Sequence, residues 1–250
     1  MQKRVHLGIL RQPDDYTCGP TCLHAVYRYY NDTVPLEEVI AETPCLKNRG
    51  TMAVMLACQA LRRGYRATMY TYNLQLFDPT WFTEPGVNLA EKLESQAESK
   101  TGARFRASTQ AYMEYLERGG TIRFENLTAA LIRRHLNRFM PILTGLSATY
   151  LYGCAREFGP SDDYDDIRGE PSGHFVVLYG YNKETRTVLV ADPLHPNPVS
   201  ETQHYEVNID RLIAAIFLGV LTYDANLLIL QPGRKKGRRY YASPNRRQQS

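Results

Sequence analysis

Apolar residues recur every three or four positions in several stretches of the chain, a spacing typical of helices that bury one face. The first stretch follows the turn-rich segment 12–16, and its Pro20 suits the first turn of a helix. Another covers 51–63, and Gly64 directly after it suits a helix end. The expected helices are 18–30, a short one from 35, 51–63, 89–100, 108–118, 127–139 and 209–218.

Other stretches alternate in polarity or form short apolar runs, as strands do. The clearest are 173–181 and 187–191, and the turn 182–186 between them predicts an antiparallel hairpin. The expected strands are 4–10, 65–72, 141–146, 173–181, 187–191 and 227–230.

The order of these elements predicts an α+β fold in which N-terminal helices pack on a C-terminal antiparallel sheet. Residues 74–125 fit this plan least well, and we interpret them as a helical insertion with a loop of large aromatic residues. A chain of 250 residues, 43% of them apolar, can bury one substantial core. We therefore expect a single domain over residues 1–233, followed by a basic tail at 234–250.

Charge is unevenly distributed along the chain. The net charge is +4, but residues 234–250 contain seven Lys and Arg and no acidic residue, which leaves −3 for residues 1–233. A tail of this composition is expected to be largely flexible. Its basic residues and interleaved tyrosines are compatible with contact to RNA or another polyanion, although a solvated charged end is the commoner explanation.

Several features predict a cytoplasmic protein. No run of 18 apolar residues is present, so no membrane span is expected, and the N-terminus lacks the features of a secretory signal. The five cysteines are odd in number and widely spread, which argues against a disulfide framework and favours reduced thiols.

Cys18 is the first candidate for chemistry. It lies at the predicted start of a helix, where unpaired backbone N–H groups and the helix dipole favour a thiolate. Gln12, six residues upstream, is placed to turn its side-chain amide towards the sulfur. Cys22 is one turn further along the helix, but its place in the apolar repeat favours packing in the core.

The predicted hairpin in the second half supplies a base. His174 begins one strand and Asp192 follows the next, so both side chains are expected at the same end of adjacent strands. An imidazole oriented by a carboxylate can pair with the Cys18 thiolate. The Cys18 backbone N–H and the Gln12 amide would then stabilise the oxyanion that forms on a carbonyl substrate. An isolated cysteine at a helix start is more often a packing residue, and the combination of these four residues is what favours catalysis.

This constellation resembles the papain-like cysteine peptidases, and among them the family that processes double-glycine leader peptides of bacteriocins. The resemblance rests on Gln12 with Cys18-Gly six residues later, on His174 followed by Phe-Val-Val-Leu, and on Val-Leu-Val-Ala before Asp192. It implies that Cys18 is the nucleophile, His174 the general base and acid, Asp192 the residue that orients it, and Gln12 the oxyanion-hole residue.

The sequence also departs from that family. Thr17 stands where the family usually has an acidic residue, the insertion at 74–125 is unlike the compact leader peptidases, and no transporter domain is expected in the chain. The resemblance therefore implies a thiol mechanism rather than a particular substrate.

We interpret the sequence as a cysteine peptidase that hydrolyses a peptide or isopeptide bond in a peptide or protein substrate, with no cofactor. Two alternatives stay open at this stage. The same residues could make a thioester-forming acyl transferase, or the chain could be a catalytically idle papain-like module that binds a peptide or polyanion.

Other polar residues give weaker signals. The acidic loop 157–170 is either a solvated loop or a flap over the cleft that favours basic substrates. His195 is a weak candidate for a substrate contact, whereas His24, His135 and His204 are expected to pack or to lie on the surface. No Cys-x-x-Cys motif or tight His/Cys cluster is present, so no metal site is expected.

Overall fold

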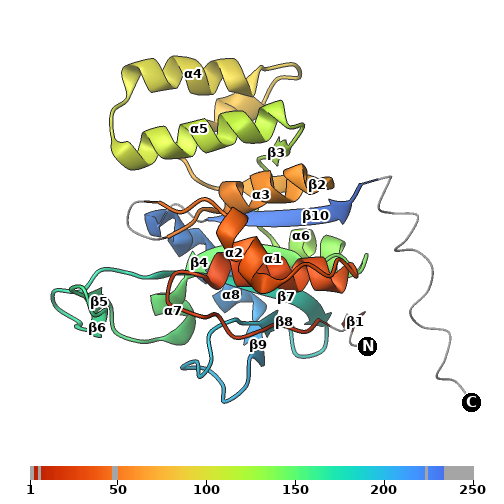
Figure 1. Cartoon of the computed structure of the whole chain (residues 1–250), viewed down its shortest axis with the longest axis vertical. Coiled ribbons are helices and arrows are strands. Elements are labelled where there is room, and N and C mark those ends of the chain that lie inside the picture. Colours follow the sequence, from red (N-terminus) through yellow and green to blue (C-terminus); the bar gives the residue numbers. More distant parts are fainter. Residues whose placement is uncertain (1–2, 5–6, 47–49, 223–224, 234–250) are drawn as a thin grey trace, which may run out of the picture.

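The computed structural model describes residues 3–4, 7–46, 50–222 and 225–233. Within them the chain forms an eight-stranded sheet with helices on both faces (Figure 1). Neighbouring strands are antiparallel except for one parallel pair, β2 with β3. The strands in spatial order are β3 (Thr121–Arg123), β2 (Tyr65–Thr71), β10 (Asn226–Pro232), β4 (Ile142–Ser147), β7 (Gly173–Asn182), β8 (Thr187–Ala191) and β9 (His204–Asn208), and β1 (Lys3–Arg4) pairs with β7.

The helices agree with the amphipathic pattern to within a few residues at most ends. The predicted α+β class and the packing of N-terminal helices on a mainly antiparallel sheet are confirmed. The α-helices are α1 (Cys18–Tyr29), α2 (Leu36–Glu42), α3 (Ala53–Arg62), α4 (Leu89–Ser99), α5 (Ala103–Glu117), α6 (Ala129–Leu136), α7 (Ala148–Tyr152) and α8 (Ile209–Leu218). Two 3₁₀ turns are η1 (Pro79–Phe82) and η2 (Gly219–Thr222).

The sheet separates two hydrophobic cores because successive strand residues point to opposite faces. On β7, Val177 packs into the core beneath α1, α3 and α5, whereas Val176 and Leu178 pack against α6 and α8. Every residue of β4 is buried, as expected for a strand covered on both faces. The strand that carries His174 is therefore fixed from both sides.

The helices α4 and α5 form the pair at the top of Figure 1, where α4 packs on α5 and α5 packs on α3. Their apolar residues join the core under α1 and α3 rather than making a core of their own. Tyr115 donates its hydroxyl to the Ala67 carbonyl at 2.9 Å, and the Phe77 ring lies edge-on to Tyr112 with centroids 4.8 Å apart. The division into a peptidase domain with an insertion stays a prediction, and the tail 234–250 lies outside the described residues.

Some sequence expectations were wrong in detail. The strand expected at 4–10 is limited, among the described residues, to Lys3–Arg4, and residues 7–10 have no regular structure. There the Leu10 carbonyl accepts a side-chain hydrogen bond from Gln203 instead of joining a ladder. The helix expected from Ser108 begins five residues earlier, at Ala103. The structure also contains elements that the sequence pattern did not predict: β3, α7, β9 and the hairpin of β5 (Glu157–Phe158) with β6 (Asp163–Tyr164).

Candidate active site

Cys18 is the first residue of α1, as the sequence predicted, and only 8% of it is exposed. The glycine after it is required by packing. A Cβ on Gly19 would lie 2.6 Å from Thr51 Cγ2 and 3.2 Å from Phe175 Cδ2. The start of α1 therefore lies directly against β7, beside the residue that follows His174.

His174 and Asp192 are in contact. The residues Val177 and Ala191 are partners in the β7–β8 ladder, which places His174 and Asp192 beyond the same end of that pairing. His174 Nε2 lies 2.8 Å from Asp192 Oδ1. A carboxylate only accepts hydrogen bonds, so Nε2 carries the proton and Nδ1 is the ring nitrogen left for another partner.

Cys18 is the thiol that interacts with His174, and its side chain is among the groups that raise the pKa of the imidazole. Burial of His174 by itself would lower the pKa of the imidazole. The charge of Asp192 and its hydrogen bond, together with the hydrogen bond and charge of Cys18, outweigh burial and raise that pKa. These interactions favour the imidazolium form of His174 beside the Asp192 carboxylate.

Asp192 is completely buried, and its carboxylate accepts four hydrogen bonds. Oδ1 accepts from His174 Nε2 and from the Leu194 backbone N–H at 2.9 Å. Oδ2 accepts the hydroxyls of Tyr152 at 2.9 Å and Tyr205 at 2.6 Å. Burial alone would raise the pKa of Asp192, but the charge and hydrogen bond of His174 and the hydrogen bonds from Tyr205 and Leu194 hold it below its usual value.

Sequence reasoning missed both tyrosines, because it also missed the elements that carry them. Tyr152 ends α7 and Tyr205 lies on β9. The alternation of polar and apolar residues over 204–208 was a usable signal for β9.

Gln12 is 93% buried and lies in the loop before α1. Its side-chain Nε2 donates to the Asp14 carbonyl at 2.9 Å, which uses one of the two N–H groups of the amide. Its Oε1 is buried and has no hydrogen-bond partner in the described part of the chain. The Gln12 backbone N–H donates to the Pro193 carbonyl at 2.9 Å, which ties this loop to the residue after Asp192.

Gln203 strengthens the same connection and was not singled out from the sequence. Its Nε2 donates to the Leu10 carbonyl at 3.0 Å and to the Asp192 carbonyl at 3.1 Å. The Asp192 backbone N–H donates back to the Gln203 carbonyl at 2.8 Å. One glutamine thus joins the segment before Gln12 to the residue that contacts His174.

Cys22 is fully buried, as its place in the apolar repeat predicted. Its thiol donates to the Phe175 carbonyl at 3.2 Å. Burial, with smaller effects from Cys18 and Asp192, raises the pKa of the Cys22 thiol. Its burial and raised pKa make Cys22 a poor nucleophile.

The acidic segment 157–170 folds into the small β5–β6 hairpin beside the site, at the left of Figure 1. Glu157 exchanges backbone hydrogen bonds with Glu170, which is close in sequence to His174. Burial, together with Asp162 and Asp15, raises the pKa of Glu157, and a hydrogen bond with Ser172 opposes that change. The segment is thus a structured neighbour of His174 rather than an irregular loop.

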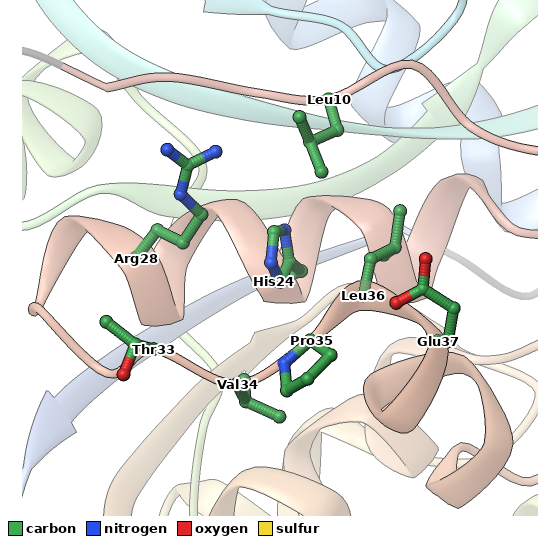
Figure 2. A pocket seen from close by; sticks show the side chains of 8 residues that line it. All are labelled: Leu10, His24, Arg28, Thr33, Val34, Pro35, Leu36 and Glu37. Carbon is green, nitrogen blue, oxygen red and sulfur yellow. The ribbon is translucent and has the colours of Figure 1, made fainter.

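Among the histidines considered from the sequence, His24 and His135 are buried, His195 is half-buried and His204 is exposed. Figure 2 shows His24 in the floor of a groove of about 370 Å³, with Arg28 and Glu37 at its two ends. Burial and then the charge of Arg28 lower the pKa of His24, which keeps its imidazole neutral. His195 Nδ1 is buried and has no hydrogen-bond partner in the described ranges.

The described residues also bear on metal binding and on membrane insertion. They contain no group of three or more His, Cys, Asp or Glu side chains that could hold a metal ion. None of their helices has both the length and the apolar character needed to cross a bilayer.

A thiol at a helix start, an imidazole on a strand and a carboxylate behind it are typical of papain-like cysteine peptidases. Comparison of the sequence with known families agrees with this class. The model of the Peptidase_C39 like family matches residues 6–212, which include all four candidate residues. The protein therefore belongs to the Peptidase_C39 like family and is a cysteine peptidase, and the resemblance found in the sequence is confirmed.

Solved structures show similarity over most of the chain. A double glycine motif protease from an AMS/PCAT transporter, in complex with the leader peptide, is 16% identical, with a TM-score of 0.43 and 92% of this chain and 94% of that chain covered. The peptidase domain of Streptococcus ComA is 14% identical, with a TM-score of 0.42 and coverage of 91% and 99%. Xylellain, a cysteine protease from Xylella fastidiosa, is 13% identical, with a TM-score of 0.47 and coverage of 93% and 86%. No curated protein matches the chain.

Proposed function

We propose that the protein hydrolyses an amide bond of a peptide or protein substrate through Cys18, His174 and Asp192, with Gln12 in the oxyanion hole. The observation that carries this proposal is the 2.8 Å hydrogen bond between His174 Nε2 and Asp192 Oδ1, with Cys18 at the start of α1 interacting with the same imidazole. The raised pKa of His174 supports an imidazolium that can stabilise a thiolate.

The reaction follows from these contacts. The Cys18 thiolate attacks the substrate carbonyl, and the oxyanion receives hydrogen bonds from the Cys18 backbone N–H and from the second N–H of the Gln12 amide. His174 gives its Nδ1 proton to the departing amine, which leaves a thioester on Cys18. Water, deprotonated by His174, then hydrolyses the thioester and restores the thiol.

A peptide or protein substrate follows from membership of a peptidase family. Cleavage of a peptide bond and of an isopeptide bond give different products, so product analysis distinguishes them. The same analysis identifies an acyl transferase, because an amine acceptor would then appear in the product.

The five cysteines are all free, and a mechanism that needs the Cys18 thiol suits a reducing compartment such as the cytoplasm.

Alkylation by iodoacetamide tests the proposal, because Cys45 provides an exposed reference thiol in the same molecule. At pH 6 an ordinary thiol is almost entirely protonated, so we expect Cys18 to react at least about tenfold faster than Cys45 despite its burial. Mass spectrometry assigns each adduct. The variant C18A, which keeps Cys22, should lose the fast adduct and all cleavage of a peptide library. A fast adduct on Cys22, or cleavage that survives in C18A, would contradict the assignment.

A further inference from the structure

Two tyrosines stand behind the residue that orients the candidate base. We propose that Tyr152 and Tyr205 are positioning residues of the peptidase site, whose hydroxyls keep Asp192 ionised and fixed in the orientation that holds His174. This inference rests on the proposed function of Cys18, His174 and Asp192. It adds the two groups that allow a fully buried carboxylate to stay ionised and to orient His174.

The hydrogen bonds on Asp192 support this role. A carboxylate offers about four acceptor positions, two on each oxygen. His174 and Leu194 take those on Oδ1, and the two tyrosine hydroxyls take those on Oδ2. Without the tyrosines, Oδ2 would be a buried acceptor with no partner among the described residues, and the carboxylate could rotate or bind a proton.

Tyrosine suits this position because it donates without carrying a charge. An arginine or lysine at Oδ2 would compete with His174 as the counter-ion of Asp192. Burial, and then the charge of Asp192, raises the pKa of both tyrosines. Their hydroxyls therefore stay protonated and stay donors over the whole range in which a peptidase would work.

The fold fixes both hydroxyls independently of substrate. Tyr205 is the ladder partner of Val190, two residues before Asp192. The end of α7 is held by Arg211, whose guanidinium donates to the carbonyls of Tyr150 and Leu151. The two donors thus reach one oxygen from separate elements, a short helix and an edge strand.

The other charged or titratable groups near this cluster come from α1, β5 and β7. Cys18 and Cys22 on α1 interact electrostatically with members of the cluster, and Glu157 on β5 interacts with His174. None of them donates to Oδ2, which accepts from the two tyrosines. The titratable groups that interact with Asp192 or with its hydrogen-bond partners are therefore Cys18, Cys22, Tyr152, Glu157, His174 and Tyr205.

The variants Y152F, Y205F and their double mutant test this role, since each removes a hydroxyl and keeps the ring. The readout is the rate of Cys18 alkylation by iodoacetamide against pH, with the adduct assigned by mass spectrometry. Fewer donors make the Asp192 carboxylate easier to protonate. We therefore expect the acidic limb of the profile to move to higher pH by about one unit for each hydroxyl.

Tyr115 provides the matched control. It is a fully buried tyrosine whose hydroxyl donates to two backbone carbonyls, those of Ala67 and Thr121, both at 2.9 Å. Y115F removes an equally buried hydroxyl whose partners are backbone carbonyls rather than a carboxylate, so its profile should keep the wild-type midpoint. Urea unfolding shows which variants are folded at the pH values used.

The outcomes separate the two proposals. An upward shift in the folded variants, with an unchanged midpoint in Y115F, supports the positioning role. Slower alkylation at every pH with an unchanged midpoint, or no change at all, overturns it while leaving a reactive wild-type Cys18 as support for the proposed function. An unreactive wild-type Cys18 overturns the proposed function itself. If Y205F does not fold, Y152F, whose ring is only half-buried, decides the matter alone.

Discussion

The backbone N–H of Gln12 donates to the Pro193 carbonyl at 2.9 Å, and this bond joins the two halves of the candidate site. The loop that leads to Cys18 is thereby fixed to the residue next to Asp192. Gln203 adds two hydrogen bonds across the same junction, to Leu10 and to Asp192. Two segments about 180 residues apart in the chain are thus joined by a direct hydrogen bond between the loop before Cys18 and the residue after Asp192.

The backbone bond makes Gln12→Ala an informative change, because it survives when the side chain is removed. We expect Q12A to lower the kcat of peptide cleavage by about 10²–10³, the usual cost of one oxyanion-hole donor. Alkylation of Cys18 forms no oxyanion, so its rate should stay near that of the wild type. Steady-state kinetics on a cleaved peptide and alkylation kinetics measure the two effects.

Gln96 is the control for that experiment. Its Nε2 donates to the Leu76 carbonyl at 2.9 Å, the same bond length and acceptor type as the bond from Gln12 to Asp14. Gln96 Oε1 also accepts from Lys100 Nζ at 2.6 Å, so Q96A should lose at least as much stability, about 1 kcal/mol or more, without losing cleavage. Equal loss of kcat in Q12A and Q96A, or slow alkylation in Q12A, would show that Gln12 acts through folding alone.

Gly19 tests how closely α1 must approach β7. Alanine is favoured over glycine within a helix by up to about 1 kcal/mol, but here its Cβ would lie 2.6 Å from the buried side chain of Thr51. Overpacking of this kind costs about 1–3 kcal/mol. We expect G19A to be less stable in urea unfolding and to alkylate more slowly at Cys18, because the start of α1 is pushed away from His174.

Gly8 serves as the comparison, because a Cβ there would meet no atom within 4 Å. G8A should match the wild type in both measurements. A G19A variant as stable and as reactive as G8A would mean that the helix start tolerates displacement from β7.

The sequence could predict the pieces of the site that local patterns encode. Proline and glycine after Cys18 mark a helix start, and the turn between two apolar runs brings His174 and Asp192 to one end of a hairpin. These inferences need only short-range rules, and the structure places the residues as those rules require.

The contacts of Tyr152, Tyr205 and Gln203 could not be predicted in the same way. Each depends on where a short element lies relative to a strand that is distant in the sequence, and α7 has only five residues. So short a helix spans little more than one turn and has almost no periodic signal. Its stability comes from tertiary packing, which no local pattern shows. The order of the strands, with β10 between β2 and β4, is likewise a tertiary property that no local pattern encodes.

The His174–Asp192 pair also predicts how stability depends on pH. The pKa of Asp192 is lowered in the folded protein, so its contribution is complete above its unfolded value of about 3.9 and is lost as the pH falls through the folded value. The pKa of His174 is raised, so its contribution is complete below about 6.5 and is lost as the pH rises through the folded value. The pair should therefore stabilise the fold most between about pH 4 and 6.5.

Urea unfolding of the wild type and of D192N from pH 3 to 9 measures this dependence. We expect the difference in unfolding free energy between the two proteins to be largest in that window and to decline on both sides, by about 1.4 kcal/mol for each unit of pKa shift. E94Q makes the same kind of carboxylate-to-amide change at an exposed position of α4 and should follow the wild-type curve. A constant difference between wild type and D192N across the whole range would mean that Asp192 contributes by packing and neutral hydrogen bonds, and that His174 is uncharged in the folded enzyme.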